Sequence, residues 1–308
     1  MTDGWNNVGC LLCGSRKSDT IFPGHLQEHK EDDLSAYISA SRVSAVHGPV
    51  VRCKSCGFVY SNPQPSALVL EQTYRRLSSN AYVSEKAARL RTAERMLDVV
   101  EKQCPGRGTI MDVGCSTGLF LQCAQQRGWK VLGIEPSSWA IEECRRHNLP
   151  VQQGIIESAD LQPGAFDVVT MWDMLEHSVN PRVALAKVHF ALKTGGTLFV
   201  DVPNVDSWMA RLLRHRWPLL LVEHLWYFSP STLNTLLKEN GFGLVAKLSH
   251  PVTFSMGFIL IRLAQQGLFP SVLATRIGSD SLLRRLLITF RMGEMTAVAQ
   301  KLDHPEKG

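Results

Sequence analysis

Short apolar runs alternate with helix-like patterns along the last two-thirds of the chain. Runs such as 109–113 and 166–172 are rich in apolar residues, as strands buried on both faces of a sheet are. Between these runs, apolar positions recur every three or four residues, and the capping residues Ser137 and Ser229 precede two such stretches. This order predicts an α/β domain built on a seven-stranded, mostly parallel sheet, with an antiparallel last strand at about 295–302.

Three parts of the chain differ in pattern. The proline-containing segment Asn62-Pro63-Gln64-Pro65 closes a first module, which we place at residues 1–63. Residues 64–104 show helix-like spacing of leucines and are interpreted as a helical lead-in. The α/β domain then spans 105–308. Within it, residues 254–292 are expected to form a helical insertion, where a compact domain needs only a hairpin.

Charge and hydropathy narrow the class of protein. The net charge of +5 over 308 residues is too small to indicate a nucleic-acid partner, and we expect none. No apolar run approaches the roughly 18 residues of a membrane span, and the polar first residues lack an apolar signal core. We therefore expect a cytoplasmic protein that contacts the inner face of the membrane peripherally, if at all.

Two cysteine pairs predict a metal site in the first module. Cys10 and Cys13 form one C-x-x-C pair, Cys53 and Cys56 form the other, and a glycine follows each pair. This spacing lets two thiolates from one tight turn bind one metal, and two such turns complete a tetrahedral four-cysteine zinc site. Four thiolates leave no open position, so the zinc is expected to be structural. A redox-active dithiol is the alternative, although it needs only one pair.

The run at 109–113 leads into a turn of small residues. Gly114 and Gly118 allow the backbone to approach a ligand closely. A second run ends in Glu135, an acid placed to accept hydrogen bonds from the two hydroxyls of a ribose. Ser116 stands where the dinucleotide fingerprint G-x-G-x-x-G requires its second glycine, so a pyrophosphate is not the expected ligand. An ordinary β-α-β crossover with a glycine turn is the alternative.

Several segments resemble the pattern of class I S-adenosylmethionine (SAM) methyltransferases. They are the turn at 112–118, Glu135, Phe166-Asp167-Val168-Val169, Asp173-Met174-Leu175-Glu176-His177, Leu192-Lys193-Thr194-Gly195-Gly196 and Glu223-His224-Leu225-Trp226-Tyr227-Phe228-Ser229-Pro230. The most similar groups are the ubiquinone-pathway O-methyltransferases and the bacterial sugar methyltransferases. The paired cysteines resemble the zinc module of nucleotide-sugar C-methyltransferases. The resemblance implies a Rossmann-like methyltransferase sheet and a SAM site formed by Asp112, Gly114, Cys115, Ser116, Gly118, Glu135, Pro136, Ile156, Glu157 and Trp172.

The same resemblance assigns parts of SAM to parts of the chain. The turn lies under the methionine portion, and Ile156 and Glu157 meet the adenine, with Asp160 as an alternative acid. Trp172 either borders this pocket or packs in the core. Tyr82 is the candidate for covering the methionine end.

Candidate catalytic residues follow the fourth strand and precede the sixth. Methyl transfer from a sulfonium is an in-line displacement, for which the protein aligns donor and acceptor while a base takes the proton of an acceptor hydroxyl. We expect Asp173, Glu176, His177 and His224 to be catalytic, with Glu223 beside them. By resemblance to the ubiquinone-type enzymes, Asp173, Glu176 and His177 are linked to a divalent metal near the acceptor. Helix capping by the acids and core packing of His177 are the alternatives.

The resemblance implies an enzyme, a SAM-dependent methyltransferase acting on a hydroxyl or carbon of a sugar, a lipid-linked glycan or a quinone-like small molecule. The alternative is a catalytically degenerate protein of this fold that serves as a zinc-dependent binding or scaffold module. Segments 207–222 and 254–292 mix apolar, aromatic and basic residues, as helices in a membrane interface do. A helical cap or a dimer face accounts for them equally well, and the sequence selects neither the acceptor nor the oligomeric state.

Overall fold

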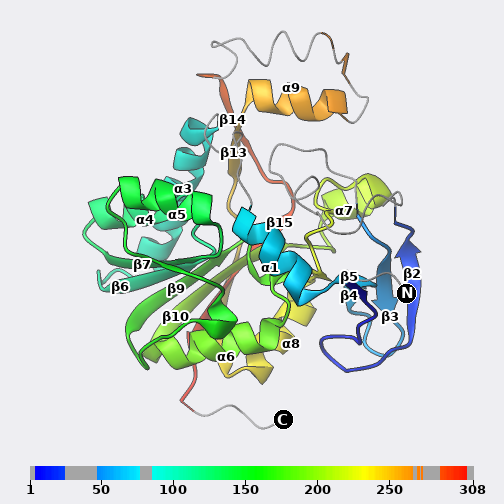
Figure 1. Cartoon of the computed structure of the whole chain (residues 1–308), viewed down its shortest axis with the longest axis horizontal. Helices are drawn as coiled ribbons and strands as arrows, with labels where there is room; N and C mark the ends of the chain where they lie inside the picture. The colour runs from blue at the N-terminus through cyan, green and yellow to red at the C-terminus, as the bar shows by residue number, and fades with distance from the viewer. Residues whose placement is uncertain are drawn as a thin grey trace.

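A computed structural model describes residues 4–24, 47–76, 85–265, 269, 270, 272 and 285–303. Its centre is a sheet of seven strands: β6 (Thr109–Val113), β7 (Lys130–Glu135), β8 (Val151–Gln153), β9 (Phe166–Trp172), β10 (Leu192–Pro203), β12 (Phe242–Leu248) and β15 (Glu294–Lys301). The strand order is β12-β15-β10-β9-β6-β7-β8 (Figure 1). Strands β10, β9, β6, β7 and β8 are parallel, whereas β15 runs antiparallel to β10 and β12. The expected sheet, with its antiparallel last strand, is confirmed.

Burial explains why the central strands read as apolar runs. Strand β9 is buried at five of its seven positions because the sheet is covered on both faces. Strand β10 begins at Leu192, directly after the preceding helix, and its pairing with β9 is irregular between Leu192 and Thr197. Gly195 lies in that irregular stretch with a φ of 70°. The expected turn at 193–196 is thus built into the start of the strand.

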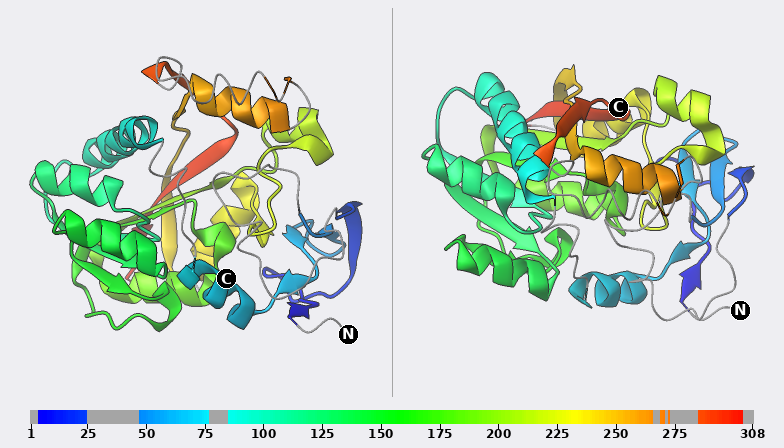
Figure 2. Two further views of the ribbon diagram at one scale, coloured as in Figure 1. Left: turned by 45° about the horizontal axis from the view of Figure 1, so that its top comes forward. Right: turned by 90° about the horizontal axis from the view of Figure 1, so that it is seen from above.

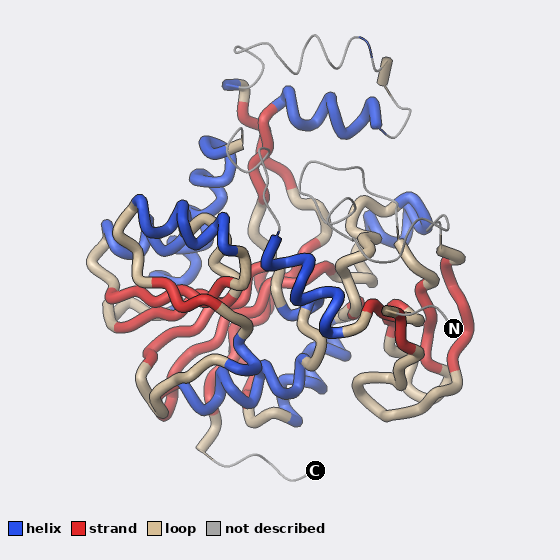
Figure 3. The backbone as a smooth tube through the Cα atoms, viewed as in Figure 1, coloured by secondary structure: helices blue, strands red, loops and turns tan. Residues whose placement is uncertain are grey.

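Helices cover both faces of the sheet, as Figure 3 shows. On one side lie α3 (Lys86–Gln103), α4 (Leu119–Gln126) and α5 (Ser138–Arg146), and on the other lie α6 (Pro181–Ala191) and α8 (Pro230–Glu239). The predicted caps are present. Ser137 accepts a hydrogen bond from the amide of Ala140 at 3.1 Å, and Ser229 and Thr232 form a reciprocal capping box at the start of α8.

The first residues form a small antiparallel sheet beside the large one. Its strands, in the order β11-β4-β3-β2, are β2 (Ser18–Phe22), β3 (Val50–Cys53), β4 (Val59–Ser61) and β11 (Trp226–Tyr227). Because β11 comes from the large domain, the two parts of the chain share a sheet. The rings of Phe58, Tyr60, Trp226 and Phe228 pack across this junction, with centroids 5.5–6.2 Å apart. Strand β1 (Trp5–Asn6) pairs with β5 (Gln64–Pro65) in a separate two-stranded sheet. Helix α1 (Ala67–Arg76) comes after β5.

The predicted insertion contains a strand pair and a helix, here called the α9 arm: β13 (Val252–Ser255), α9 (Met256–Gln265) and β14 (Leu287–Phe290). Figure 2 shows the arm standing away from the large sheet. Helix α3 anchors it, because Arg95 donates to the hydroxyls of Thr253 and Thr289 at 2.7 and 3.0 Å. Residues 273–284, which include Arg284, lie outside the described residues. Within the described ranges, no helix has the length and apolar character needed to cross a bilayer.

Candidate functional site

A large cavity of about 960 Å³ lies at the carboxyl ends of the parallel strands. Its wall includes the turn after β6, the end of β7, the loops after β8 and β9, the loop before β11, α1, α3 and the α9 arm. Doubly wound sheets bind their ligands at this edge. The volume is near the upper limit of the roughly 300–1,000 Å³ found for small-molecule sites, so two adjacent small molecules fit.

The predicted turn of small residues forms one end of the cavity. Gly114, Cys115 and Ser116 line it. Gly114 has a φ of 76°, and a Cβ at this position would lie 3.1 Å from Cγ of Met174, so both conformation and space favour glycine. Ser116 also has a positive φ, 49°, and its amide donates to the carboxylate of Glu135 at 2.8 Å.

Gly118 lies behind the turn rather than in the described cavity wall. It precedes α4 with a φ of 75° and does not line the cavity. A Cβ there would lie 2.5 Å from Cδ1 of Leu149 and 2.9 Å from Sγ of Cys144. The glycine therefore lets α4 pack closely against its neighbours.

Two buried acids lie beneath the turn. Glu135 accepts hydrogen bonds from the amides of Ser116 and Ser137, both at 2.8 Å. Burial raises the pKa of Glu135, and the two amides lower it in part. Its carboxylate lines the cavity, and each oxygen has a second lone pair for a ligand hydroxyl. Asp112 accepts a hydrogen bond from Thr170 Oγ1 at 2.7 Å, and burial raises the pKa of Asp112 to about 7.

The wall beyond Glu135 alternates apolar and polar groups. Pro136, Ile156 and Glu157 all line the cavity, as expected. Glu157 accepts a hydrogen bond from the hydroxyl of Ser178 at 2.6 Å. Asp160, the alternative acid, does not line the described wall. Glu157 is therefore the acid positioned to meet a ligand here.

Trp172 lies between the cavity and the core. It lines the cavity, and its ring meets those of Phe120 and His250 edge-on, with centroids 5.6 and 5.8 Å apart. Both interpretations of this tryptophan thus hold at once. Tyr82, the other aromatic candidate, lies outside the described residues.

Two histidines of the cavity wall lie beside the buried side chain of Glu176. The rings of His177 and His224 have centroids 4.7 Å apart, and donor atoms of these rings and of Glu176 lie within 4.8 Å of one another. Glu176 is fully buried, and neither of its carboxylate oxygens has a hydrogen-bond partner among the described residues. The structure thus brings three of the four candidate catalytic residues together and leaves Asp173 outside the group.

Backbone carbonyls orient both imidazoles. His177 Nδ1 lies 3.0 Å from the carbonyl oxygen of Glu223, and His224 Nδ1 lies 2.9 Å from that of Leu219. Because a carbonyl only accepts, each Nδ1 carries a proton and each Nε2 offers a lone pair. Burial lowers the pKa of His177 to about 4, and burial with the neighbouring His177 lowers that of His224 well below its ordinary value. Both rings are therefore neutral at neutral pH.

Tyr74 of α1 is a site residue that the sequence did not reveal. Its hydroxyl lies 3.0 Å from His177 Nδ1, and its side chain lines the cavity. A tyrosine within a predicted amphipathic helix was the only signal available. Nothing local indicates that this helix meets the loop after β9.

Asp173 belongs to a second acidic group at the strand ends. It lines the cavity with a φ of 48°, a left-handed conformation uncommon for residues other than glycine. Burial, with repulsion from Asp201 and Glu294, raises the pKa of Asp173 to about 8. Asp201 accepts a hydrogen bond from Thr296 Oγ1 at 2.6 Å and lies 3.4 Å from His250 Nδ1. Burial raises the pKa of Glu176, and Asp173 still lies close enough to that acid to help raise it.

The small sheet holds the loop that carries His224. Ser61 Oγ donates to the carbonyl of His224 at 2.9 Å, and the Ser61 amide donates to that of Leu225 at 2.9 Å. Gln64 Nε2 also donates to the Leu225 carbonyl, at 3.1 Å. The Leu225 amide in turn donates to the carbonyl of Glu176 at 2.9 Å. Buried hydrogen bonds therefore connect the first module directly to the histidine end of the cavity.

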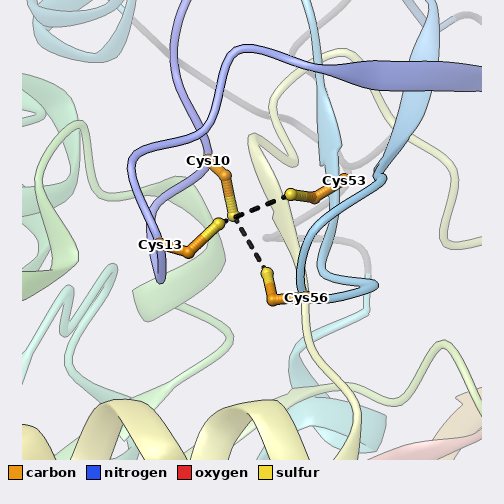
Figure 4. A group of neighbouring side chains, drawn as sticks. All are labelled: Cys10, Cys13, Cys53 and Cys56. Carbon is orange, nitrogen blue, oxygen red and sulfur yellow. Dashed lines mark hydrogen bonds between the residues drawn. The ribbon is translucent and has the colours of Figure 1, made fainter.

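The four predicted zinc ligands lie together beside the small sheet (Figure 4). The sulfurs of Cys10 and Cys56 are 3.4 Å apart, those of Cys13 and Cys53 are 3.5 Å apart, and all four lie within 4.8 Å of one another. Tetrahedral zinc, with Zn–S bonds of about 2.3 Å, holds its sulfurs roughly 3.8 Å apart. The donor set therefore fits this ion.

The two cysteine turns share one geometry. The amide of Gly14 donates to the Cys10 carbonyl at 2.9 Å, and that of Gly57 donates to the Cys53 carbonyl at 3.0 Å. Both glycines have positive φ, 70° and 77°, as the predicted turns require. Arg182 on α6 donates to two carbonyls of the first turn at 3.1 and 3.2 Å, which fastens that turn to the large domain.

The chain has relatives among curated proteins. The ubiquinone biosynthesis O-methyltransferase of Idiomarina loihiensis is 37% identical over 109 residues, which are 32% of this chain and 45% of the relative. The protein of the same name from Chromobacterium violaceum is 26% identical over 163 residues, which are 48% of this chain and 70% of the relative. The chain spans about half the length of most of the curated relatives it matches.

The chain is also similar to solved structures and matches a family model. A SAM-dependent methyltransferase from Thermotoga maritima is similar with a TM-score of 0.45 and 19% identity, over 72% of this chain and 97% of that one. Magnesium protoporphyrin IX methyltransferase from Synechocystis has a TM-score of 0.48 and 10% identity, over 73% of this chain and 88% of that one. The model described as a methyltransferase domain matches residues 80–247, more than half of the chain. The chain therefore belongs to the methyltransferase-domain family.

Proposed function

We propose that this chain is a SAM-dependent methyltransferase that methylates a hydroxyl of a small-molecule acceptor. The observation that carries the proposal is the cavity, which joins the Gly114 turn and Glu135 to the imidazoles of His177 and His224. Membership of the methyltransferase-domain family supports the reaction class, and the O-methyltransferase name of the relatives supports oxygen as the accepting atom.

The Glu135 end of the cavity fits SAM. Glu135 has lone pairs for the ribose hydroxyls, and Glu157 can accept from the adenine amine beside the apolar Ile156 and Pro136. The backbone at Gly114 allows close approach of the methionine portion. When bound, SAM supplies a methyl group that its sulfonium already activates. The remaining tasks of the protein are to align the acceptor, exclude water and take a proton.

His177 and His224 are suited to take that proton. Each ring is neutral, carries its proton on Nδ1 and offers the Nε2 lone pair. Glu176 lies beside both rings without another partner among the described residues. Burial raises its pKa well above the ordinary value, and an imidazolium formed beside it would favour its ionised form, so the two charges would stabilise each other.

We further propose that the same three side chains can bind a divalent cation. Two imidazole nitrogens and one carboxylate are a common donor set for such ions, and metal-binding histidines usually donate their other N–H to a carbonyl or carboxylate. His224 takes the place that the sequence assigned to Asp173. A cation held by these residues would polarise the acceptor oxygen. Proton transfer and cation binding use the same lone pairs, so metal analysis decides between the two roles.

We also propose that Cys10, Cys13, Cys53 and Cys56 bind one structural zinc. The sulfur–sulfur distances and the matched turns support this donor set. Zinc sites of this kind contribute roughly 10 kcal/mol or more to folding of small modules. The ion would stabilise the sheet that holds the His224 loop.

The acceptor is proposed to carry an apolar portion. Segments 207–222 and 254–292 both line the cavity, through Met209, Leu219, Phe254 and Phe258 among others. Helix α7 (Trp208–Leu213) exposes Trp208 and Leu212, at 67% and 70% of their surface. These exposed groups favour contact with a bilayer that holds a lipid-linked acceptor.

Calorimetric titration of the chain with SAM and with its demethylated product tests the proposed function. We expect saturable binding that weakens at least tenfold in Gly114→Val and Glu135→Ala. Leu212→Ala, an exposed residue outside the cavity wall, is the control. The proposal is rejected if the chain does not bind SAM, or if both site variants bind SAM with the wild-type dissociation constant.

A further inference from the structure

Two arginines line the cavity from different elements. Arg262 belongs to α9 and Arg89 to α3, and both contribute to the wall. The guanidinium of Arg262 lies 5.0 Å from the ring centroid of Phe258, and Phe258 stacks on Phe254 with centroids 5.4 Å apart and planes 5° apart. This part of the wall therefore combines fixed positive charge with aromatic surface.

A buried group of hydrogen bonds joins the start of α3 to the start of α9, the two helices that carry the arginines. The carboxylate of Glu85 accepts from the amide and the hydroxyl of Ser255 at 3.1 and 2.8 Å. The Ser255 hydroxyl accepts in turn from the amide of Phe258 at 3.0 Å. Arg89 lies one helical turn after Glu85, and Arg262 lies one turn after Phe258. Both guanidinium groups are thus set from one anchored point.

We propose that the cavity binds its acceptor through an anionic group, a carboxylate or a phosphate, held by Arg89 and Arg262. The planar guanidinium matches both oxyanions and binds them through charge-assisted hydrogen bonds. Burial lowers the pKa of Arg262, the nearby carboxylate of Glu223 raises it in part, and the neighbouring Arg89 lowers it further. Two like charges this close favour a shared anion between them. The anion site is argued from the cavity alone, and it rests on the proposed function only where the bound molecule is identified as the methyl acceptor.

The position of the arginines gives the acceptor a direction. Arg89 lies on α3 and Arg262 on α9. An anionic group held by both residues points toward α3 and the α9 arm, and the rest of the acceptor extends along the wall that His177 and His224 also line. The acceptor class is therefore a hydroxyl compound that bears a carboxylate or phosphate and has an apolar portion.

The test measures anion binding without methyl transfer. Phenyl phosphate, benzoate and the neutral benzamide are titrated into the full chain by NMR, with and without the demethylated product of SAM. We expect at least one anion to bind tenfold more tightly than benzamide, and the preferred anion identifies carboxylate or phosphate. Arg262→Gln and Arg89→Gln should each remove most of that preference, whereas Arg262→Lys should keep part of it. Arg91→Gln, on the exposed face of α3, is the matched control.

Three results would overturn the inference: equal affinity for benzoate and phenyl phosphate compared with benzamide, no binding of either anion, or a preference that survives both glutamine variants. Thermal unfolding of each variant verifies that it folds. Failure of the demethylated product to bind would count against the proposed function instead, because the anion titrations are also run without it.

Discussion

The ring of His177 stands edge-on to that of His224, with planes 81° apart and centroids at 4.7 Å. One residue follows β9 and the other precedes β11, so they meet only because the loop before β11 folds back over the strand ends. The Leu225 amide secures this fold by donating to the Glu176 carbonyl at 2.9 Å. The pair presents two neutral imidazoles to one cavity.

Replacing His224 with glutamine should slow methyl transfer without weakening cofactor binding. A positioned base contributes about 10²–10⁴-fold to rate, so we expect kcat to fall at least 100-fold. The SAM dissociation constant should change less than twofold, since His224 is not among the residues predicted to bind SAM. His215→Gln, at an exposed site, should leave both values unchanged. A parallel loss of SAM affinity in His224→Gln would contradict this assignment.

Metal analysis should separate two sites. The wild-type chain is expected to hold about one zinc in the four-cysteine site and to bind a second divalent ion when it is supplied. Glu176→Gln should abolish only the second ion, because it removes the carboxylate charge from that donor set. Cys53→Ser should remove the zinc and destabilise the first module. If neither substitution changes the amount of bound zinc or of the second divalent ion, both assignments are wrong.

Removing the Ser61 hydroxyl should affect the histidine end of the cavity from a distance. The Ser61→Ala variant leaves the buried carbonyl of His224 without its donor, at a cost of about 1–3 kcal/mol. We expect kcat to fall at least tenfold with an unchanged SAM dissociation constant. Ser55→Ala, exposed in the second cysteine turn, is the control. Equal kinetics for both variants would show that the first module does not position the loop.

Asp112→Asn should change the pH dependence of stability. Burial raises the pKa of Asp112 from 3.8 to about 7, so the folded protein loses stability as pH rises through this window. Asparagine keeps an acceptor for the Thr170 hydroxyl and cannot ionise. Its stability relative to wild type should therefore rise by roughly 2–3 kcal/mol between pH 5 and pH 8 in urea unfolding. Asp160→Asn, on the surface, should not move the profile, and identical profiles for Asp112→Asn and wild type would disprove the ionisation.

Sedimentation with anionic liposomes tests bilayer contact. Trp208→Ala with Leu212→Ala should reduce the bound fraction several-fold, because these side chains are the most exposed apolar groups of α7. Raising salt should weaken binding, since attraction between Arg285 and the headgroups is screened within roughly 10 Å at 0.1 M salt. Phe190→Ala, an exposed apolar residue on α6, is the control. If neither the double substitution nor added salt changes the bound fraction, these segments are better explained as a helical cap of the protein itself.

Local patterns determined the elements and much of the cavity wall around the Gly114 turn. The apolar runs of β6 and β9, the caps Ser137 and Ser229, and the glycine at 114 each follow from interactions within a few residues. The two C-x-x-C turns are equally local, because spacing and a following glycine suffice to aim two thiolates at one point. Glu135 could be predicted as a site residue because it is the last residue of a strand in a recognisable β-α-β unit.

The tertiary structure alone decided how the acceptor end is assembled. His224 joins Glu176 in place of Asp173, Tyr74 reaches His177, and Arg262 lines the same cavity as Arg89. The residues in each of these groups come from different elements and meet through the return of the loop before β11 and the anchoring of the α9 arm. No periodicity or spacing encodes such contacts, because they depend on how whole elements pack rather than on the neighbours of any one residue.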